Sequence, residues 1–200
     1  MYRLTASLIN SWLRAMDSDA LGNEYADFLA DLYREKRPTS PAAQAGIDFE
    51  DLVHRASVVG DAILGEEPTT ELQAALGFGR RVRNGAYQVR GEKQVTIREL
   101  PINLVGIADF VKAGIITDIK RVQRYEYGKY QFSAQHPMYL ELWPEAMRFD
   151  YLIWDGSYAY MEQYRRGDCD SILSIGAGFL KYLDDADLID VYKTKWEEKK

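Results

Sequence analysis

The segment GIADFVKAGIITDIKRV, residues 106–122, decides how this chain is expected to fold. It consists of two apolar stretches that meet at a glycine, and each has the length and the β-branched composition of a strand. Each stretch also carries an aspartate, Asp109 or Asp118, where a buried strand normally has an apolar side chain. Charged groups in a segment that otherwise resembles protein core indicate a functional site.

A tight turn at residues 113–114 would place the two aspartates side by side. With a two-residue loop, Lys112 lies opposite Ile115, and counting back along both strands places Asp109 directly opposite Asp118. Opposed residues project from the same face of a sheet, with Cβ atoms about 4.5–5.5 Å apart. The sequence therefore predicts two neighbouring carboxylates on partly buried strands.

Carboxylates this close repel each other by about 3 kcal/mol at an effective dielectric constant near 20. A divalent cation between Asp109 and Asp118 removes the repulsion, and Mg²⁺ typically binds one or two carboxylates together with waters and phosphate oxygens. Lys120 projects from the same face, and its charge would stabilise a nucleophilic hydroxide or developing charge on a phosphate. The pattern indicates phosphodiester hydrolysis. The alternative is that Asp118 and Lys120 form an exposed ion pair, which contributes little to stability.

Two further pairs of residues accompany this hairpin. One pair precedes it on a predicted helix, and the other follows it four residues apart on the next predicted helix, so that both members share one face. In chain order the set is Gly46 and Glu50, Gly106 and Asp109, Asp118 and Lys120, Gln135 and Tyr139.

This ordered set resembles the PD-(D/E)XK nuclease superfamily, and more narrowly the RecB-type and phage recombination exonucleases similar to RecE and lambda exonuclease. The resemblance covers about residues 4–166. It implies that Asp109, Asp118 and the backbone carbonyl of Ile119 bind Mg²⁺ or Mn²⁺, and that Lys120 positions the attacking water. Glu50 stands where the family has a histidine or an acid that completes the metal site or orients water.

The resemblance also implies substrate contacts and partners. Gln135 and Tyr139 would shape the pocket and touch DNA, and Arg121, where relatives often have threonine, would alter phosphate contacts. Relatives with an iron–sulfur cluster carry four cysteines, whereas this chain has only Cys169, so no cluster is expected. The implied partners are DNA, a single-strand annealing or recombinase protein, and further copies of the chain, since lambda-like relatives form rings.

The length allows one large core or two small ones, and the order of the predicted helices and strands favours one mixed α/β domain over residues 1–200. The resemblance implies a restriction-endonuclease-like core, with a central mixed sheet flanked by helices. The element order predicts a helical N-terminal lobe over about 1–85, followed by the catalytic sheet and helices over about 86–200. Gly91 and Gly114 are predicted turns, and the last helix is expected to end near residue 182, before a charged end. The net charge of −6 argues against general polyanion binding. The absence of long apolar segments predicts a cytoplasmic protein of a bacterium or phage-infected host, without membrane contact.

These features predict a metal-dependent deoxyribonuclease, most simply an exonuclease in phage-type recombination or DNA end processing. One alternative is a catalytically inactive DNA-binding or assembly protein on the same fold. The other is an unrelated fold in which the motifs coincide by chance.

Overall fold

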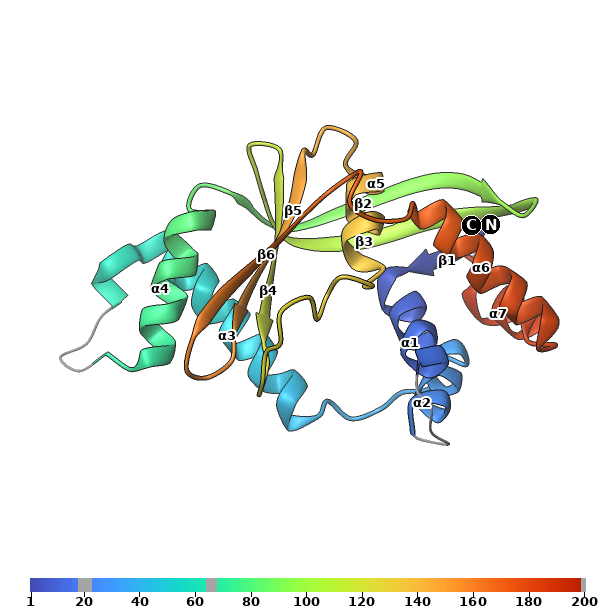
Figure 1. Cartoon of the computed structure of the whole chain (residues 1–200), viewed down its shortest axis with the longest axis horizontal. Helices are drawn as coiled ribbons and strands as arrows, with labels where there is room; N and C mark the ends of the chain where they lie inside the picture. The colour runs from blue at the N-terminus through green and yellow to red at the C-terminus, as the bar shows by residue number, and fades with distance from the viewer. Residues whose placement is uncertain (18–22, 64–67, 199–200) are drawn as a thin grey trace.

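The computed structural model describes residues 1–17, 23–63 and 68–198 and shows an α/β fold in which helices flank one mixed six-stranded sheet (Figure 1). The strands follow the order β1-β3-β4-β5-β6, and β2 also pairs with β3. Their bounds are β1 (Tyr2–Thr5), β2 (Ala86–Ile97), β3 (Leu100–Lys112), β4 (Ile115–Arg121), β5 (Arg148–Trp154) and β6 (Ala159–Arg165). The predicted central mixed sheet with flanking helices is confirmed.

β3 organises the sheet. β2 pairs with it antiparallel along its length, while its other edge is divided between two partners. β1 runs parallel to the first half of β3, with Leu4 beside Leu104, and β4 pairs antiparallel with its last residues. The sequence gives no signal for β1, because four residues are too few to display a strand period.

The helices cover the two faces of the sheet unequally. They are α1 (Ala6–Asp17), α2 (Asn23–Leu32), α3 (Pro41–Val59), the 3₁₀ turn η1 (Gly60–Ile63), α4 (Thr70–Val82), α5 (Gln135–Leu142), α6 (Ile172–Asp185) and α7 (Ile189–Trp196). One core joins α1, α2, α5, α6 and α7 to one face, where Ile116 lies. A smaller core joins α3 and α4 to the opposite face, where Ile119 lies. The N-terminal helices therefore pack in two separate groups rather than as the one lobe expected from their sequence order (Figure 1).

The two predicted glycine turns have different outcomes. Gly114, with a φ of 75°, forms the turn between β3 and β4 as predicted. The prediction for Gly91 is wrong, because β2 continues through it and Gly91 pairs with Gly106 of β3. A Cβ at Gly91 would lie 2.8 Å from the indole ring of Trp143, at the end of α5. Gly91 therefore has no side chain because the indole of Trp143 packs against the strand there, and not because the chain turns.

A further helix, α7, follows the helix that the sequence predicts to be the last, and it takes up part of the charged C-terminal segment. Tyr192 is completely buried, and its hydroxyl donates a hydrogen bond to the Arg3 carbonyl at 3.0 Å. The indole of Trp196 donates to the Leu32 carbonyl at 2.9 Å. The aromatic residues of α7 thus hold the C-terminal part of the chain against β1 and α2.

In the described ranges, no helix combines the length and the apolar character needed to cross a bilayer.

Candidate active site

The β3–β4 hairpin has the register that the sequence predicts. Ala113 and Gly114 both have positive φ, 48° and 75°, and form a two-residue turn that places Lys112 opposite Ile115. The ladder continues to Phe110 opposite Thr117 and stops there. The next positions are Asp109 and Asp118, where the strands separate.

Asp109 takes the place of a backbone acceptor at this separation. Its Oδ2 accepts a hydrogen bond from the Ile119 N–H at 2.7 Å, and the residue is only 9% exposed. The N–H of Val122 donates to the Trp154 carbonyl of β5, so Ile119, three residues earlier, directs its backbone groups to the other edge, toward β3. The Ile119 carbonyl therefore faces the same side as its N–H, beside Asp109.

Asp118 lies at the centre of a polar network. It is 3% exposed, its Oδ1 accepts a hydrogen bond from Gln135 Nε2, and its Oδ2 lies 2.6 Å from Lys120 Nζ. Gln135 is the first residue of α5, so that helix contributes directly to the site. The ammonium group of Lys120 also lies 6.0 Å from the ring centroid of Tyr151. Asp118, Lys120 and Gln135 are brought together as predicted.

Glu50 reaches the same cluster from α3. That helix begins at Pro41, and the Ser40 side chain caps it by accepting from the Ala43 N–H at 3.1 Å. The Oε1 of Glu50 accepts hydrogen bonds from Gln88 Nε2 and, at 3.1 Å, from the hydroxyl of Tyr87. Burial, and next the charge of Glu50, raise the pKa of Tyr87 to about 12, so this hydroxyl keeps the proton that it donates.

Gln88 and Tyr87 are site residues that sequence reasoning missed. Gln88 has a φ of 52°, and the β2–β3 ladder is interrupted between Tyr87, opposite Phe110, and Val89, opposite Ala108. The missing pair is Gln88 with Asp109. A left-handed glutamine within a strand is unusual and costs about 1–3 kcal/mol, and such residues cluster at functional sites. No local pattern in the sequence marks it.

The cluster is electrostatically unbalanced without a cation. Burial raises the pKa of Asp109 well above its usual value, and the charges of Asp118 and Glu50 raise it further. Burial acts to lower the pKa of Lys120, but the charge of Asp118 and of the other two carboxylates outweighs it, and the pKa lies above its usual range. Lys120 is therefore a protonated ammonium group at neutral pH. One ammonium group faces three carboxyl groups.

The donor set fits Mg²⁺ or Mn²⁺ held by two carboxylates. Asp109, Asp118 and the Ile119 carbonyl present oxygen ligands from adjoining strands, and Mg²⁺ keeps several waters in its other positions. Within residues 1–17, 23–63 and 68–198, however, no three His, Cys, Asp or Glu side chains come close enough to bind one ion together. Asp109 and Asp118 are therefore the two carboxylates that could hold an ion together, while Glu50 accepts hydrogen bonds from Tyr87 and Gln88.

Tyr139 and Arg121 lie differently from Gln135. Tyr139 is 7% exposed, and its hydroxyl donates to the Ile107 carbonyl at 2.7 Å, so that it fixes β3 next to Asp109. Arg121 alternates with Lys120 along β4 and therefore points to the opposite face. There its Nε lies 2.7 Å from Glu71 of α4. The structure does not bring Arg121 to the carboxylate cluster.

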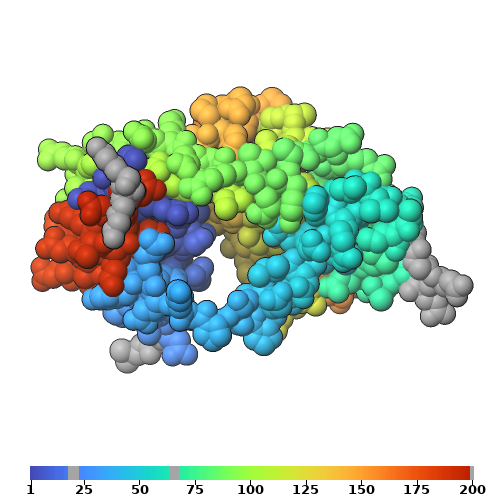
Figure 2. All heavy atoms as spheres, turned by 180° about the vertical axis from the view of Figure 1, so that it is seen from behind, coloured from blue at the N-terminus to red at the C-terminus, as the bar shows by residue number. Residues whose placement is uncertain are grey.

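The all-atom view from behind shows an opening through the molecule (Figure 2). The first part of α3 and the segment that precedes it border the opening on one side, and α1 borders it on another. Glu50 lies in the middle of α3.

The comparison with known proteins identifies the architecture. No family model and no curated protein matches this sequence. The crystal structure of SSO0001 superposes over 92% of this chain and 77% of that chain, with a TM-score of 0.54 and 11% sequence identity. The likeness is one of fold. The function must therefore be argued from the residues of the site itself.

His136, next to Gln135 on α5, is expected to make the stability of the protein depend on pH. It is completely buried, stacks on Tyr164 with ring centroids 4.1 Å apart, and leaves Nε2 without a hydrogen-bond partner. Burial lowers the pKa of His136 to about 4, against an opposing effect of Asp168. In the unfolded chain the His136 imidazole is thus protonated below about pH 6.5, whereas in the folded chain it stays neutral until about pH 4.

We expect the free energy of unfolding of the wild type to fall, relative to His136→Gln, by up to about 1.4 kcal/mol per pH unit between pH 6.5 and pH 4. Above pH 6.5 the difference between the two proteins is expected to be constant. Urea unfolding of both at pH 4.5, 5.5, 6.5 and 7.5 measures this. A constant difference across the whole range would show that His136 becomes protonated in the folded state as easily as in the unfolded chain.

Proposed function

We propose that this protein is a divalent-metal-dependent deoxyribonuclease of the PD-(D/E)XK type that hydrolyses phosphodiester bonds, and that it acts as an exonuclease in DNA recombination or end processing. The observation that carries the proposal is the contact network of the hairpin: Asp109 and Asp118 are buried side by side, with Lys120 at 2.6 Å from Asp118. Burying two carboxylates together is unfavourable unless a cation compensates them.

The residues of the site have separate tasks in this proposal. When bound, Mg²⁺ or Mn²⁺ would supply Lewis-acid activation of water and of the phosphate. Gln135 holds the Asp118 carboxylate through its amide, and the Ile119 N–H holds that of Asp109, so both keep their orientation. Lys120 is protonated, and its side chain is 28% exposed. Its positive charge would stabilise a phosphate oxygen or a nucleophilic hydroxide bound next to it.

Cleavage of labelled DNA tests the proposal. End-labelled linear duplex, closed circular duplex and single-stranded DNA are each incubated with Mg²⁺, Mn²⁺ or EDTA. We expect loss of the linear molecules with either metal, no reaction in EDTA, and intact circles. Lys120→Met is expected to lower kcat about a hundredfold, because it removes one preorganised charge from the reacting phosphate.

Asp190→Asn is the matched control, since this carboxylate on α7 is 92% exposed and the substitution also changes one charge. Its activity is expected to equal that of the wild type. Cleavage of closed circular DNA would support the nuclease activity but would classify the protein as an endonuclease. A folded wild type that cuts none of the substrates with either metal would contradict the proposal and favour an inactive DNA-binding protein on the same fold.

A further inference from the structure

The loop between β4 and α5 separates its aromatic residues into two sets. Residues 122–134 follow directly after Lys120 and Arg121 and end at Gln135 of the site (Figure 1). Tyr125 and Tyr130 pack inward, whereas Tyr127 is 92% and Phe132 82% exposed. Both exposed rings therefore lie on the segment that joins two parts of the candidate site.

The inward residues hold the loop in place. The hydroxyl of Tyr125 donates to Glu162 Oε1 at 2.6 Å, and the Gly128 N–H donates to the same oxygen at 3.1 Å. Tyr130 stacks on Tyr151, with ring centroids 4.5 Å apart and an angle of 19° between the planes. The exposed rings thus project from a loop that is anchored to β5 and β6. An anchored aromatic ring binds a partner at a low cost in conformational entropy.

The charge of the loop differs from that of the whole chain. Arg124 and Lys129 are exposed, and Glu126 is the loop's single acidic residue, 3.2 Å from Arg124. The whole chain, in contrast, has a net charge of −6. Basic residues that alternate with exposed aromatic rings are the arrangement by which proteins bind single-stranded nucleic acid.

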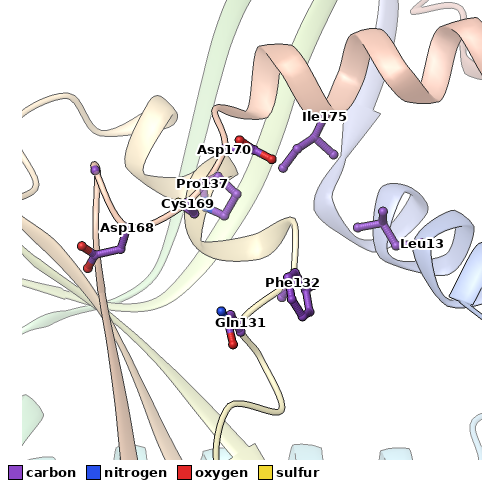
Figure 3. Close-up of a pocket in the computed structure, with 10 residues that line it drawn as sticks. Leu13, Gln131, Phe132, Pro137, Asp168, Cys169, Asp170 and Ile175 are labelled. Atoms are coloured by element: carbon purple, nitrogen blue, oxygen red, sulfur yellow. The ribbon is translucent and has the colours of Figure 1, made fainter.

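Phe132 also faces a pocket of about 490 Å³ (Figure 3). Apolar walls of this pocket come from Leu13 of α1, Pro137 of α5 and Ile175 of α6. Asp168, Asp170 and the Gln131 side chain line it as well. Two carboxylates repel a phosphate but accept hydrogen bonds from base amino groups. The Phe132 face of the loop therefore suits a base better than a backbone.

We propose that Tyr127 and Phe132 form a stacking platform for unpaired bases of the DNA strand whose backbone enters the carboxylate site. The inference rests on the proposed nuclease function and adds a substrate class to it: the scissile strand is single-stranded on the side of this loop. Arg124 and Lys129 contact its phosphates, and the two rings contact its bases. Duplex DNA, whose bases are already stacked, does not use the platform.

Binding measurements without cleavage test this directly. Fluorescence anisotropy in EDTA is recorded for the full chain with three probes: a labelled single-stranded oligonucleotide, the same length of abasic oligonucleotide, and a blunt duplex. Tyr127→Ala and Phe132→Ala are each expected to weaken binding of the single strand about tenfold and to leave the abasic strand unchanged, because only bases stack. Arg124→Ala is expected to weaken both strands alike.

Met147→Ala is the matched control. This side chain is 69% exposed and lies beside Gly114, at the other end of β4 from the loop. Its binding is expected to equal that of the wild type. Thermal unfolding of each variant shows that it folds, and light scattering gives its oligomeric state.

Each outcome bears on one of the two proposals. Ring variants that bind all three probes like the wild type, or a wild type that binds no single strand, overturn the stacking platform. A change of oligomeric state in the ring variants, with unchanged DNA binding, assigns the rings to contacts between copies and also overturns it. Base-dependent binding by a wild type that cuts no DNA supports the platform and contradicts the nuclease. If neither ring substitution changes cleavage or binding, the nuclease proposal stands and the stacking platform is overturned.

Discussion

Asp109→Asn is expected to lower the rate of metal-dependent DNA cleavage by a factor of about a thousand or more, while the protein without metal becomes more stable. The loss of activity follows from the position of Asp109 beside Asp118 and the Ile119 carbonyl. Asparagine cannot supply the negative charge that would hold the proposed divalent cation, and such a cation's stabilisation of transition-state charge amounts to several kcal/mol. Cleavage of linear DNA with Mg²⁺ measures this part of the prediction.

The gain in stability has a separate physical cause. Burial raises the pKa of Asp109 well above its usual value, and the charges of Asp118 and Glu50 add to this, so the folded metal-free protein is less stable with this carboxyl group ionised. Asparagine has no charge but retains an oxygen that accepts from the Ile119 N–H, which now donates at 2.7 Å. We expect the free energy of unfolding in EDTA to rise by about 1–2 kcal/mol.

Asp150→Asn distinguishes this effect from a general effect of removing a buried charge. Asp150 is 5% exposed, but Arg148 contacts both of its oxygens, at 2.8 and 3.0 Å, on the other face of the sheet. Removing its charge is expected to lower stability and to leave cleavage unchanged. Loss of stability in both variants, measured by urea unfolding in EDTA, would show that Asp109 is as well compensated as Asp150 and would remove the electrostatic argument for a cation.

Gly106→Ala is expected to destabilise the protein by about 3 kcal/mol, because β3 and α5 are in contact at this residue. A Cβ at Gly106 would overlap Cε1 of Tyr139 and lie 2.9 Å from Leu142 Cδ1. Both side chains belong to the core and have little room to move. For a chain of this size the midpoint of thermal unfolding is expected to fall by about 6–12 °C.

A double-mutant cycle identifies the cause of that loss. With Tyr139→Ala as the background, the further cost of Gly106→Ala is expected to fall to about 1 kcal/mol, because the overlapping ring is gone. Gly46→Ala is the control, since a Cβ there would meet no atom within 4 Å, and a helical glycine replaced by alanine gains about 0.5–1 kcal/mol. An equal cost of Gly106→Ala in both backgrounds would place the strain in the backbone rather than at Tyr139.

The parts of the site that the sequence predicts are those governed by local rules. The register of Asp109 and Asp118 depends on a two-residue turn, and Gly114 indicates that turn directly. Helical spacing predicts only that Gln135 and Tyr139 share a face of one helix, whereas the family resemblance implies the role of Gln135 in the site, and Gln135 does contact Asp118. In the hairpin the residues that fix the geometry are neighbours in the chain, so that counting along the two strands is enough to predict the register.

The features that the sequence does not predict depend on distant contacts. Gly91 has the composition of a turn, and only the indole of Trp143, more than fifty residues later, explains it within a strand. Gln88 has a left-handed conformation and donates a hydrogen bond to Glu50 of a distant helix, which no propensity of glutamine indicates. The charged residues of α7 predict a solvent-exposed segment, whereas its Tyr192 is completely buried and fixes where the helix packs.

The division of the β3 edge between β1 and β4 has a consequence for synthesis on the ribosome. β1 leaves the ribosome before β3, and its partner follows a hundred residues later, with Leu4 beside Leu104. The N-terminal residues also meet the last part of the chain, where Tyr2 bridges to Glu197 and the Glu198 N–H donates to the Met1 carbonyl at 2.9 Å. Pairing across such separations requires closure of long loops, which slows folding. The emerging chain therefore carries β1 unpaired until β3 has been made, and the groups proposed to cut DNA cannot assemble until α5 has been made.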